Sequence, residues 1–280
     1  MTLEEASNFK AYQTKEYMEH EIFTTLKDFM GFYNALSFNV MGFITPGISL
    51  RIFNIDTYVY SSIEGTLDSI NLVLEKGRIN DAFALTRKYH DAVIMDIYKA
   101  IHIKKHHSLE NWIVEDINDW ANGDGHLPWY EKMIKEIRSW DILEKLHTYF
   151  DFDGHFAKIR KKCNSHNHYN SFQYMIMNDN EIMNHHRETE LDQLSICLKD
   201  IFSLHFAYCI SLNAPYIMAS DYVDALDCGM TTDKDSQYWV APFAQTIFDK
   251  YIKSRRPKLA AYLRVMRHAI GIVSFYSIPS

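Results

Sequence analysis

The sequence predicts an all-α protein, a multi-helix bundle, and three observations lead to that prediction. Over 280 residues the chain carries only ten Gly and six Pro. Because both residues punctuate turns, a chain with so few of them has long elements and few connections. Its 18 Tyr, 17 Phe and 5 Trp supply the large side chains of a helical core. Apolar residues also recur every three or four positions, which is the spacing of one helix face. We expect a single all-helical unit over residues 1–280, with one possible subdivision into a bundle (1–180) and a C-terminal helical extension (181–280).

The N-terminal half of the chain divides into long helical segments around one irregular stretch. Residues 3–37 read as one long helix or two abutting ones, with acidic residues in the first turn that suit the helix dipole. Residues 39–56 contain two Gly, a Pro and β-branched residues, so we predict an irregular loop there. Helical periodicity returns over 57–75, and Gly77 is a natural stop. Residues 80–105 have the strongest helical pattern, with a broad apolar face and cations at the end.

The C-terminal half predicts more helices separated by polar turns. The clearest turn in the chain is NGDGHLP, residues 122–128. The acidic stretch 220–236 reads as a solvated loop, because its Asp residues lack the order of an EF-hand calcium loop. Further helices are predicted over residues 109–121, 129–150 (with a break near Ser139), 181–219, 239–253 and 259–270.

Charge and cysteine usage limit the class of partner and the compartment. The net charge of −7 and the isoelectric point of about 6.0 exclude nucleic-acid binding by bulk electrostatics, so only a local basic patch can serve. The four Cys residues show no C-x-x-C spacing and read as free thiols of a reducing compartment. The first ten residues are polar, without the apolar core of a signal peptide. We therefore expect a cytoplasmic protein.

One apolar run tests that expectation. Residues 201–219 carry no formal charge, and their length approaches that of a membrane span. However, His205, Asn213 and Pro215 interrupt the run, and neither end has a basic flank. We interpret it as a buried core helix, which can be apolar all round, and expect no contact with a membrane.

The stretch 153–170 is the candidate functional segment. Phe156, Ile159 and Cys163 follow helical spacing and define one buried face of an amphipathic helix. The polar residues that this stretch brings together are Arg160, Lys161, Lys162, Asn164, His166 and His168.

The helix of this stretch has two possible ends. We favour a break within residues 164–167, because Asn and Ser are poor helix formers and Ser165 or Asn167 can cap a new helix. A continuous helix instead puts His168 on the face of Arg160 and turns His166 towards the buried side.

Arg160 followed by five residues and then His166 resembles the R-x4-6-H signature of the HEPN superfamily. These are all-helical proteins that include metal-independent endoribonucleases of toxin and anti-phage systems. The resemblance covers about residues 60–180, and it implies an HEPN-like bundle, a homodimer, RNA as substrate and a cognate antitoxin or regulatory protein as partner. Active members usually carry Asn, Asp or His directly after the Arg, whereas Lys161 stands there in this chain.

The residue types in the segment suit this chemistry. A metal-independent ribonuclease needs a base for the 2′-hydroxyl proton, an acid for the leaving oxygen and positive charge on the phosphate. Arg160 would grip the phosphate in bidentate fashion, and Asn164 would hold a phosphate oxygen or fix a His tautomer. His166 or His168 would transfer the proton, and which of them acts is left open. The predicted substrate-binding residues are Lys161, Lys162, Arg87, His90 and Asp91.

Simpler interpretations stand beside these assignments. Arg87 lies four residues before Asp91, the spacing of an ordinary helical ion pair. The sharper interpretation is that Arg87, His90 and Asp91 face the Arg160 stretch and orient it. We predict no cofactor and no metal, because adjacent His pairs such as His106-His107 are poor chelates.

The leading functional hypothesis is an HEPN-like metal-independent endoribonuclease, which the resemblance connects with toxin or phage-defence systems. The alternative is a non-catalytic helical module that binds RNA or a partner protein through the same basic end. The two differ in Arg–His geometry, because catalysis requires an imidazole within reach of a phosphate held by Arg160.

Overall fold

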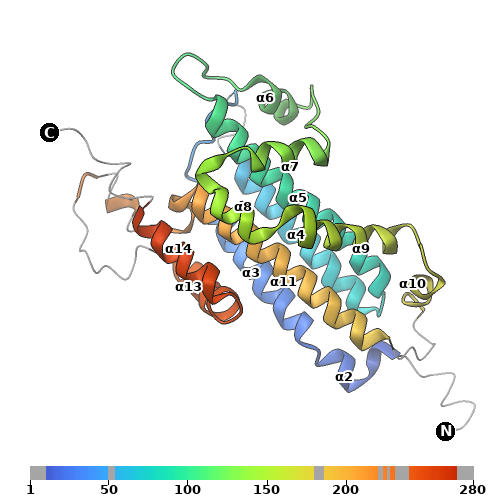
Figure 1. Cartoon of the computed structure of the whole chain (residues 1–280). Coiled ribbons are helices and arrows are strands. Elements are labelled where there is room, and N and C mark those ends of the chain that lie inside the picture. Colours follow the sequence, from blue (N-terminus) through green and yellow to red (C-terminus); the bar gives the residue numbers. More distant parts are fainter. Residues whose placement is uncertain are drawn as a thin grey trace, which may run out of the picture. The chain divides into compact units, whose positions relative to one another are not determined.

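The computed structural model describes residues 11–49, 54–179, 186–219, 223–225, 228–230 and 240–269, and it is all-α in this part of the chain (Figure 1). Within the described residues, the one β-type pairing is an isolated bridge between Gly47 and Ile113. The predicted all-α multi-helix architecture is therefore confirmed.

Four helices are much longer than the rest, namely α3, α4, α5 and α11. In chain order the elements are η1 (Ala11–Gln13), α2 (Lys15–Met18), α3 (Glu21–Asn39), α4 (Ile55–Glu75), α5 (Ile79–His106), α6 (Glu115–Asn122), α7 (Tyr130–Arg138), η2 (Asp141–Leu143), α8 (Glu144–Phe150), η3 (Phe152–Phe156), α9 (Ala157–Asn167), α10 (Phe172–Ile176), α11 (Arg187–Leu212), η4 (Ala214–Ile217), α13 (Pro242–Ile247), η5 (Phe248–Lys253) and α14 (Pro257–Ala269).

The observed bounds agree with most of the predicted segments. α3 ends at Asn39 and α4 begins at Ile55, so the intervening stretch is irregular as predicted, with 50–53 outside the described residues. The predicted break near Ser139 is confirmed, because Ser139 caps the end of α7. Most of the predicted acidic loop 220–236 also lies outside the described residues.

The chain forms two compact units, and each is assembled from three separated segments. The first comprises Met1–Gly31, Ser62–Val93 and Phe150–Phe202, and the second comprises Phe32–Ser61, Ile94–Tyr149 and Ser203–Ser280. These bounds do not follow the predicted subdivision at residue 180, which stays a prediction.

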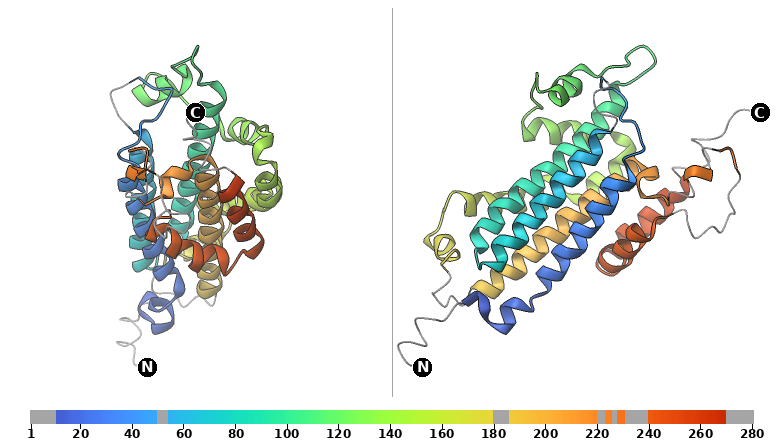
Figure 2. Two further views of the ribbon diagram at one scale, coloured as in Figure 1. Left: turned by 90° about the vertical axis from the view of Figure 1, so that its left-hand side faces the viewer. Right: turned by 180° about the vertical axis from the view of Figure 1, so that it is seen from behind.

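The first unit packs segments of the four long helices side by side, together with α9 (Figure 2). Leu67, Ile70 and Leu74 form the buried stripe of α4, at the three- and four-residue spacing that the sequence shows. Phe29 of α3 stacks on Phe202 of α11 with ring centroids 3.9 Å apart. The core is thus made where apolar faces from distant parts of the chain meet.

The second unit contains a buried ionic cluster around Lys99 of α5. Its ammonium pairs with Asp56 and, at 2.6 Å, with Asp96. Asp96 also contacts Nε2 of His205 at 2.9 Å, and the Tyr216 hydroxyl donates to Asp56 at 2.6 Å. Burial alone would raise the pKa of Asp96, but the charges of Lys99 and His205 outweigh it and hold that pKa well below its usual range. Each of these charges is therefore stable in the core only while its partners are present.

α11 contains the apolar window that raised the question of a membrane span. By length and composition the helix could cross a membrane, yet 89 % of that window is buried inside the structure. The apolar run is therefore a buried core helix, as predicted, although α11 ends at Leu212 and the short η4 follows.

Replacing Lys99 with Met is expected to lower the free energy of unfolding by about 3–5 kcal/mol, because it leaves two carboxylates buried without their cation. Urea unfolding followed by circular dichroism measures the effect. The matched control is Lys253→Met, which removes an exposed i,i+4 pair with Asp249 and should cost less than about 0.5 kcal/mol. Equal losses in the two variants would contradict the dependence of the buried carboxylates on Lys99.

Candidate functional site

The direction of α9 is set by a tight turn that precedes it. Asp151 adopts the left-handed region with φ of 39°, and its carboxylate accepts from the backbone N–H of Gly154 at 3.0 Å and of His155 at 3.2 Å. A Cβ at Gly154 would lie 2.0 Å from Oδ2 of Asp151, so a side chain at this position would displace the carboxylate that caps the turn. The π-helical turn η3 then passes directly into α9 (Figure 1).

α9 continues without a break to Asn167, so the predicted break within residues 164–167 is wrong. Its face of Ile159, Cys163 and His166 is buried, and tertiary burial of this kind outweighs the weak helix propensity of Asn and Ser. The new helix instead begins after Ser171, whose hydroxyl accepts from the Gln173 N–H at 3.3 Å and caps α10.

His166 lies inside the first unit, between two aromatic rings. Its ring stacks on Phe83 with centroids 3.9 Å apart, and Tyr174 covers it at 4.0 Å. With its amide nitrogen facing the ring, Asn80 has three acceptors within reach for its two N–H groups, namely Nδ1 of His166 at 3.0 Å and the carbonyl oxygens of His166 and Tyr174 at 3.2 Å. Burial, and then the charge of Lys162, lower the pKa of His166 to about 4. The ring is therefore neutral at pH 7.

Lys162 is also engaged within the first unit. Its ammonium pairs with Glu190 at 3.0 Å and lies 5.1 Å from the centre of the Phe83 ring. Oε2 of Glu190 in turn lies 3.8 Å from Nε2 of His166, beyond hydrogen-bonding distance. Lys162 thus helps to pack α9 against α11.

Arg87, Asp91 and Arg160 are brought together as the sharper interpretation expected. Arg87 forms an ion pair with Asp91, and Oδ1 of Asp91 lies 3.8 Å from Nε of Arg160. His90 is fully buried with Nδ1 3.5 Å from Asp91, and burial, then the charges of Arg87 and Arg160, lower its pKa to about 3. Asp91 therefore links α5 to α9, while the His90 ring belongs to the core.

The remaining predicted catalytic groups lie apart from Arg160. Asn164 is half-buried and His168 is exposed at the end of α9. Because α9 is continuous, eight residues separate Arg160 from His168, which is about 12 Å along the axis at 1.5 Å per residue. The structure therefore brings Arg160 to Asp91, beside the ring of His90, and stacks His166 on Phe83. The imidazole next to Arg160 is thus His90, which is fully buried.

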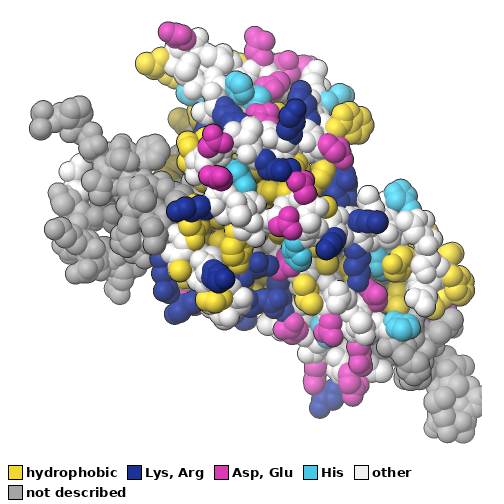
Figure 3. All heavy atoms as spheres, viewed as in Figure 1, with side chains coloured by type: hydrophobic (Ala, Val, Ile, Leu, Met, Phe, Trp, Pro, Cys, Tyr) yellow, Lys and Arg dark blue, Asp and Glu magenta, His cyan; other side chains and the backbone are white. Residues whose placement is uncertain are grey.

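A different set of side chains faces outward on this segment. We call it the α9–α10 surface, and its exposed residues are Lys158, Lys161, His168, Tyr169, Phe172 and Met175. Phe172 is 74 % exposed and Tyr169 is 47 % exposed, and Tyr169 holds a left-handed φ of 48° that a bulky residue seldom adopts. Figure 3 shows cationic and His side chains beside hydrophobic ones toward α10.

The α9–α10 surface is free of acidic residues along the chain. No Asp or Glu occurs between Asp153 and Asp179 in the sequence, although the whole chain has a net charge of −7. The signal in the sequence that marks Tyr169 and Phe172 is this acid-free interval with aromatics among cations, which is independent of the Arg–His spacing.

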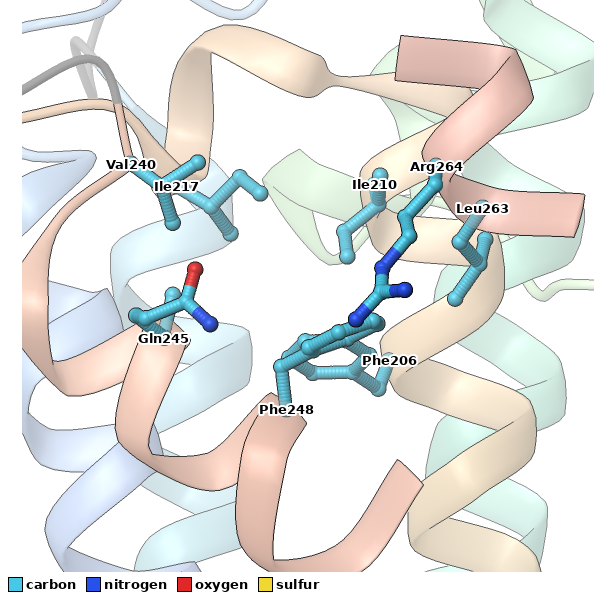
Figure 4. Close-up of a pocket in the computed structure, with 9 residues that line it drawn as sticks. Phe206, Ile210, Ile217, Val240, Gln245, Phe248, Leu263 and Arg264 are labelled. Atoms are coloured by element: carbon cyan, nitrogen blue, oxygen red, sulfur yellow. The ribbon is translucent and has the colours of Figure 1, made fainter. Parts of the chain in front are cut away.

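The second unit contains an apolar pocket with a cavity of about 190 Å³ (Figure 4). It lies among α11, α13, η5 and α14, and its polar side chains are Gln245 and Arg264, both directed towards the cavity. The guanidinium of Arg264 lies 5.7 Å from the centre of the Phe248 ring. Neither polar side chain is a proton-transfer group or a nucleophile near neutral pH, so the pocket suits binding and not catalysis.

Comparison of the chain with protein-family models, curated proteins and solved structures found no match.

The two buried His residues of the first unit are expected to make folding pH-dependent. Their folded pKa values, about 4 for His166 and about 3 for His90, lie below the unfolded value of 6.5, so only the unfolded chain gains these protons as the pH falls below 6.5. The stability that the two neutral His residues contribute is therefore fully present above pH 6.5 and decreases as the pH falls towards 4.

Urea unfolding at stepped pH values measures this dependence. In His166→Phe we expect the free energy of unfolding to fall less as the pH is lowered, because only His90 still contributes to the fall. His168→Phe, at an exposed position, should retain the full decrease. An unchanged pH profile in His166→Phe would contradict the buried, neutral state of His166.

Proposed function

We propose that this protein is a helical module that binds single-stranded RNA on the α9–α10 surface without cleaving it. The observation that carries the proposal is the opposite orientation of two residue sets on one segment. The imidazole with the catalytic spacing, His166, is buried between aromatic rings, whereas the rings of Tyr169 and Phe172 are exposed, as is Lys161 on the preceding helix.

Single-stranded RNA matches the chemistry of this surface. Lys158 and Lys161 supply the positive charge that phosphates require, and no acidic neighbour along the segment opposes them. Unpaired bases stack on exposed aromatic side chains, each contact contributing about 1–3 kcal/mol, which suits Tyr169 and Phe172. The amides of Asn167 and Asn170 are exposed between these groups and can bond base edges.

The endoribonuclease hypothesis is the alternative, and the same geometry argues against it. A general acid or base must come within hydrogen-bond reach of the reacting oxygen, while His166 is buried and His168 lies about 12 Å along the helix from Arg160. Arg160 already faces Asp91, which competes with a phosphate for the guanidinium. Catalysis by these residues would require α9 to unpack from Phe83 and Tyr174.

The other implications of the HEPN resemblance are proposals as well. A homodimer and a cognate antitoxin or regulatory protein rest on the family resemblance around Arg160 and His166. A cytoplasmic location is supported by Cys163, Cys197 and Cys209, which are buried free thiols.

Binding is tested by fluorescence anisotropy with a labelled, unstructured RNA oligonucleotide. Tyr169→Ala and Phe172→Ala should each weaken binding about tenfold, the equivalent of about 1.4 kcal/mol of lost stacking per ring. Lys161→Ala should also weaken binding and reduce its dependence on salt. The matched controls are Trp129→Ala and Lys132→Ala, which remove an aromatic ring and a cation from exposed positions of the other unit. If the controls weaken binding as much as the surface variants, the RNA site lies elsewhere.

Cleavage of total RNA in EDTA separates the binding module from the nuclease. We expect the purified protein to leave RNA intact to the same extent as Arg160→Ala and the double variant His166→Ala/His168→Ala. Metal-independent cleavage by the unmodified protein that both variants lose would overturn the non-catalytic proposal and support the ribonuclease hypothesis. Gel analysis of RNA length over time provides the readout.

A further inference from the structure

A cluster of metal-ligating side chains lies in the second unit, where α5 ends. His102 and His106 stand four residues apart on α5, so both project from the same side of the helix, and their ring centroids are 4.3 Å apart. Glu136 of α7 meets them, with Oε1 at 2.5 Å from Nδ1 of His102 and 4.0 Å from Nε2 of His106. One ligand atom from each of the three residues lies within 4.8 Å of the others.

A fourth residue prepares His102 for this role. Nε2 of His102 lies 2.9 Å from Oδ2 of Asp116 on α6, so both ring nitrogens face carboxylates. A neutral imidazole carries one N–H, and it can donate to only one of these two partners. If that proton stays on Nε2 and donates to Asp116, Nδ1 presents its lone pair on the side of Glu136 and His106. Metal-bound His residues commonly have this carboxylate behind the ring, which orients the ring and raises its basicity.

We propose that His102, His106 and Glu136 form a binding site for a borderline transition-metal ion, with Zn²⁺ as the preferred class, and that Asp116 orients His102. Two imidazole nitrogens and one carboxylate oxygen are a donor set that Zn²⁺ accepts, whereas Ca²⁺ and Mg²⁺ prefer oxygen ligands alone. Three protein ligands leave a fourth tetrahedral position for water, and the 52 % exposure of the His106 side chain leaves that side open to solvent.

The geometry needs only a small adjustment to hold the ion. At Zn–N and Zn–O distances of about 2.0–2.2 Å, ligand atoms of a tetrahedral site lie about 3.4 Å apart. Rotation of the exposed His106 side chain can close the 4.0 Å separation from Glu136, because it requires no movement of α5 or α7. The bound ion would join the end of α5 to α7 within the second unit.

Spacing also explains why sequence inspection passed over this site. The neighbouring pair His106-His107 is more conspicuous but is a poor chelate, because its side chains diverge by about 100° on a helix. The pair at i,i+4 was already present as His102 and His106 in the sequence IHIKKHH. Glu136 has no recognisable spacing to either residue, since only folding brings α7 to α5.

Zinc binding to the full chain tests the proposal. Protein stripped with EDTA and dialysed is titrated with Zn²⁺ against a chromophoric chelator, and we expect one equivalent to bind. His106→Ala and the near-isosteric Glu136→Gln should each weaken binding at least tenfold, and Asp116→Asn should weaken it about 10–100-fold. Circular dichroism of each metal-free variant verifies that the fold is retained.

The matched control is His107→Ala, which removes an imidazole from the adjacent position and should bind Zn²⁺ as the unmodified protein does. Substitution by Co²⁺ provides a second readout, because its visible absorption reports the ligand set and should change in His106→Ala. Failure of the unmodified protein to bind, or equal binding by the unmodified protein and His106→Ala, would overturn the proposal. Loss of binding in His107→Ala equal to that in His106→Ala would overturn it as well.

Discussion

The buried cation Lys99 is the constraint on which the second unit depends most. Asp56 of α4, Asp96 of α5 and His205 of α11 are all nearly inaccessible to solvent, and each is stable there because of a charged or hydrogen-bonding partner. Removing two ions from water costs several kcal/mol each, so the cluster contributes little net stability over an apolar core of the same shape. Its larger effect is on geometry. Asp96 and Lys99 lie one turn apart, so rotation or slippage of α5 in the second unit would separate buried charges, and α5 is thereby held in one register.

The first unit uses uncharged imidazoles in an analogous way. His166 and His90 occupy core positions, stacked on Phe83 and Phe156 respectively, and burial keeps both in the neutral form. A His that is neutral, apolar on its faces and hydrogen-bonded at its edge packs much as an aromatic residue does. In this structure Arg160 contacts Asp91, and His166 packs between aromatic rings. Asp91, between Arg87 and Arg160, shows that a charged cluster can likewise join helices.

The parts of the fold that periodicity controls are the parts that sequence predicts well. α5 follows the predicted segment 80–105 within one residue at each end, because its apolar face is broad and its last turn carries cations. The end of α9 was not predictable from propensity, since Asn164 to Asn167 are weak helix formers that the burial of Cys163 and His166 holds in the helix. At the candidate site, the ion pair of Arg87 with Asp91 was anticipated from their helical spacing, whereas the contact of Asp91 with Arg160 followed only from the separate interpretation that these residues face the Arg160 stretch. The end of α9 also determines whether His166 or His168 is buried. The contact of Glu136 with His102 depends on tertiary folding alone.

The division into two units, each made of three separated segments, has a consequence for synthesis on the ribosome. The first unit includes residues up to Phe202, so it cannot be completed until that helix has emerged, even though its first segment is made at the start. Until then α3, α4 and α5 have apolar faces without their final partner. Contacts between segments so far apart in the chain close large loops, which slows folding and prolongs exposure of hydrophobic surface. A nascent chain of this design has to be sheltered by chaperones or kept soluble by its own polar faces until α11 has been translated.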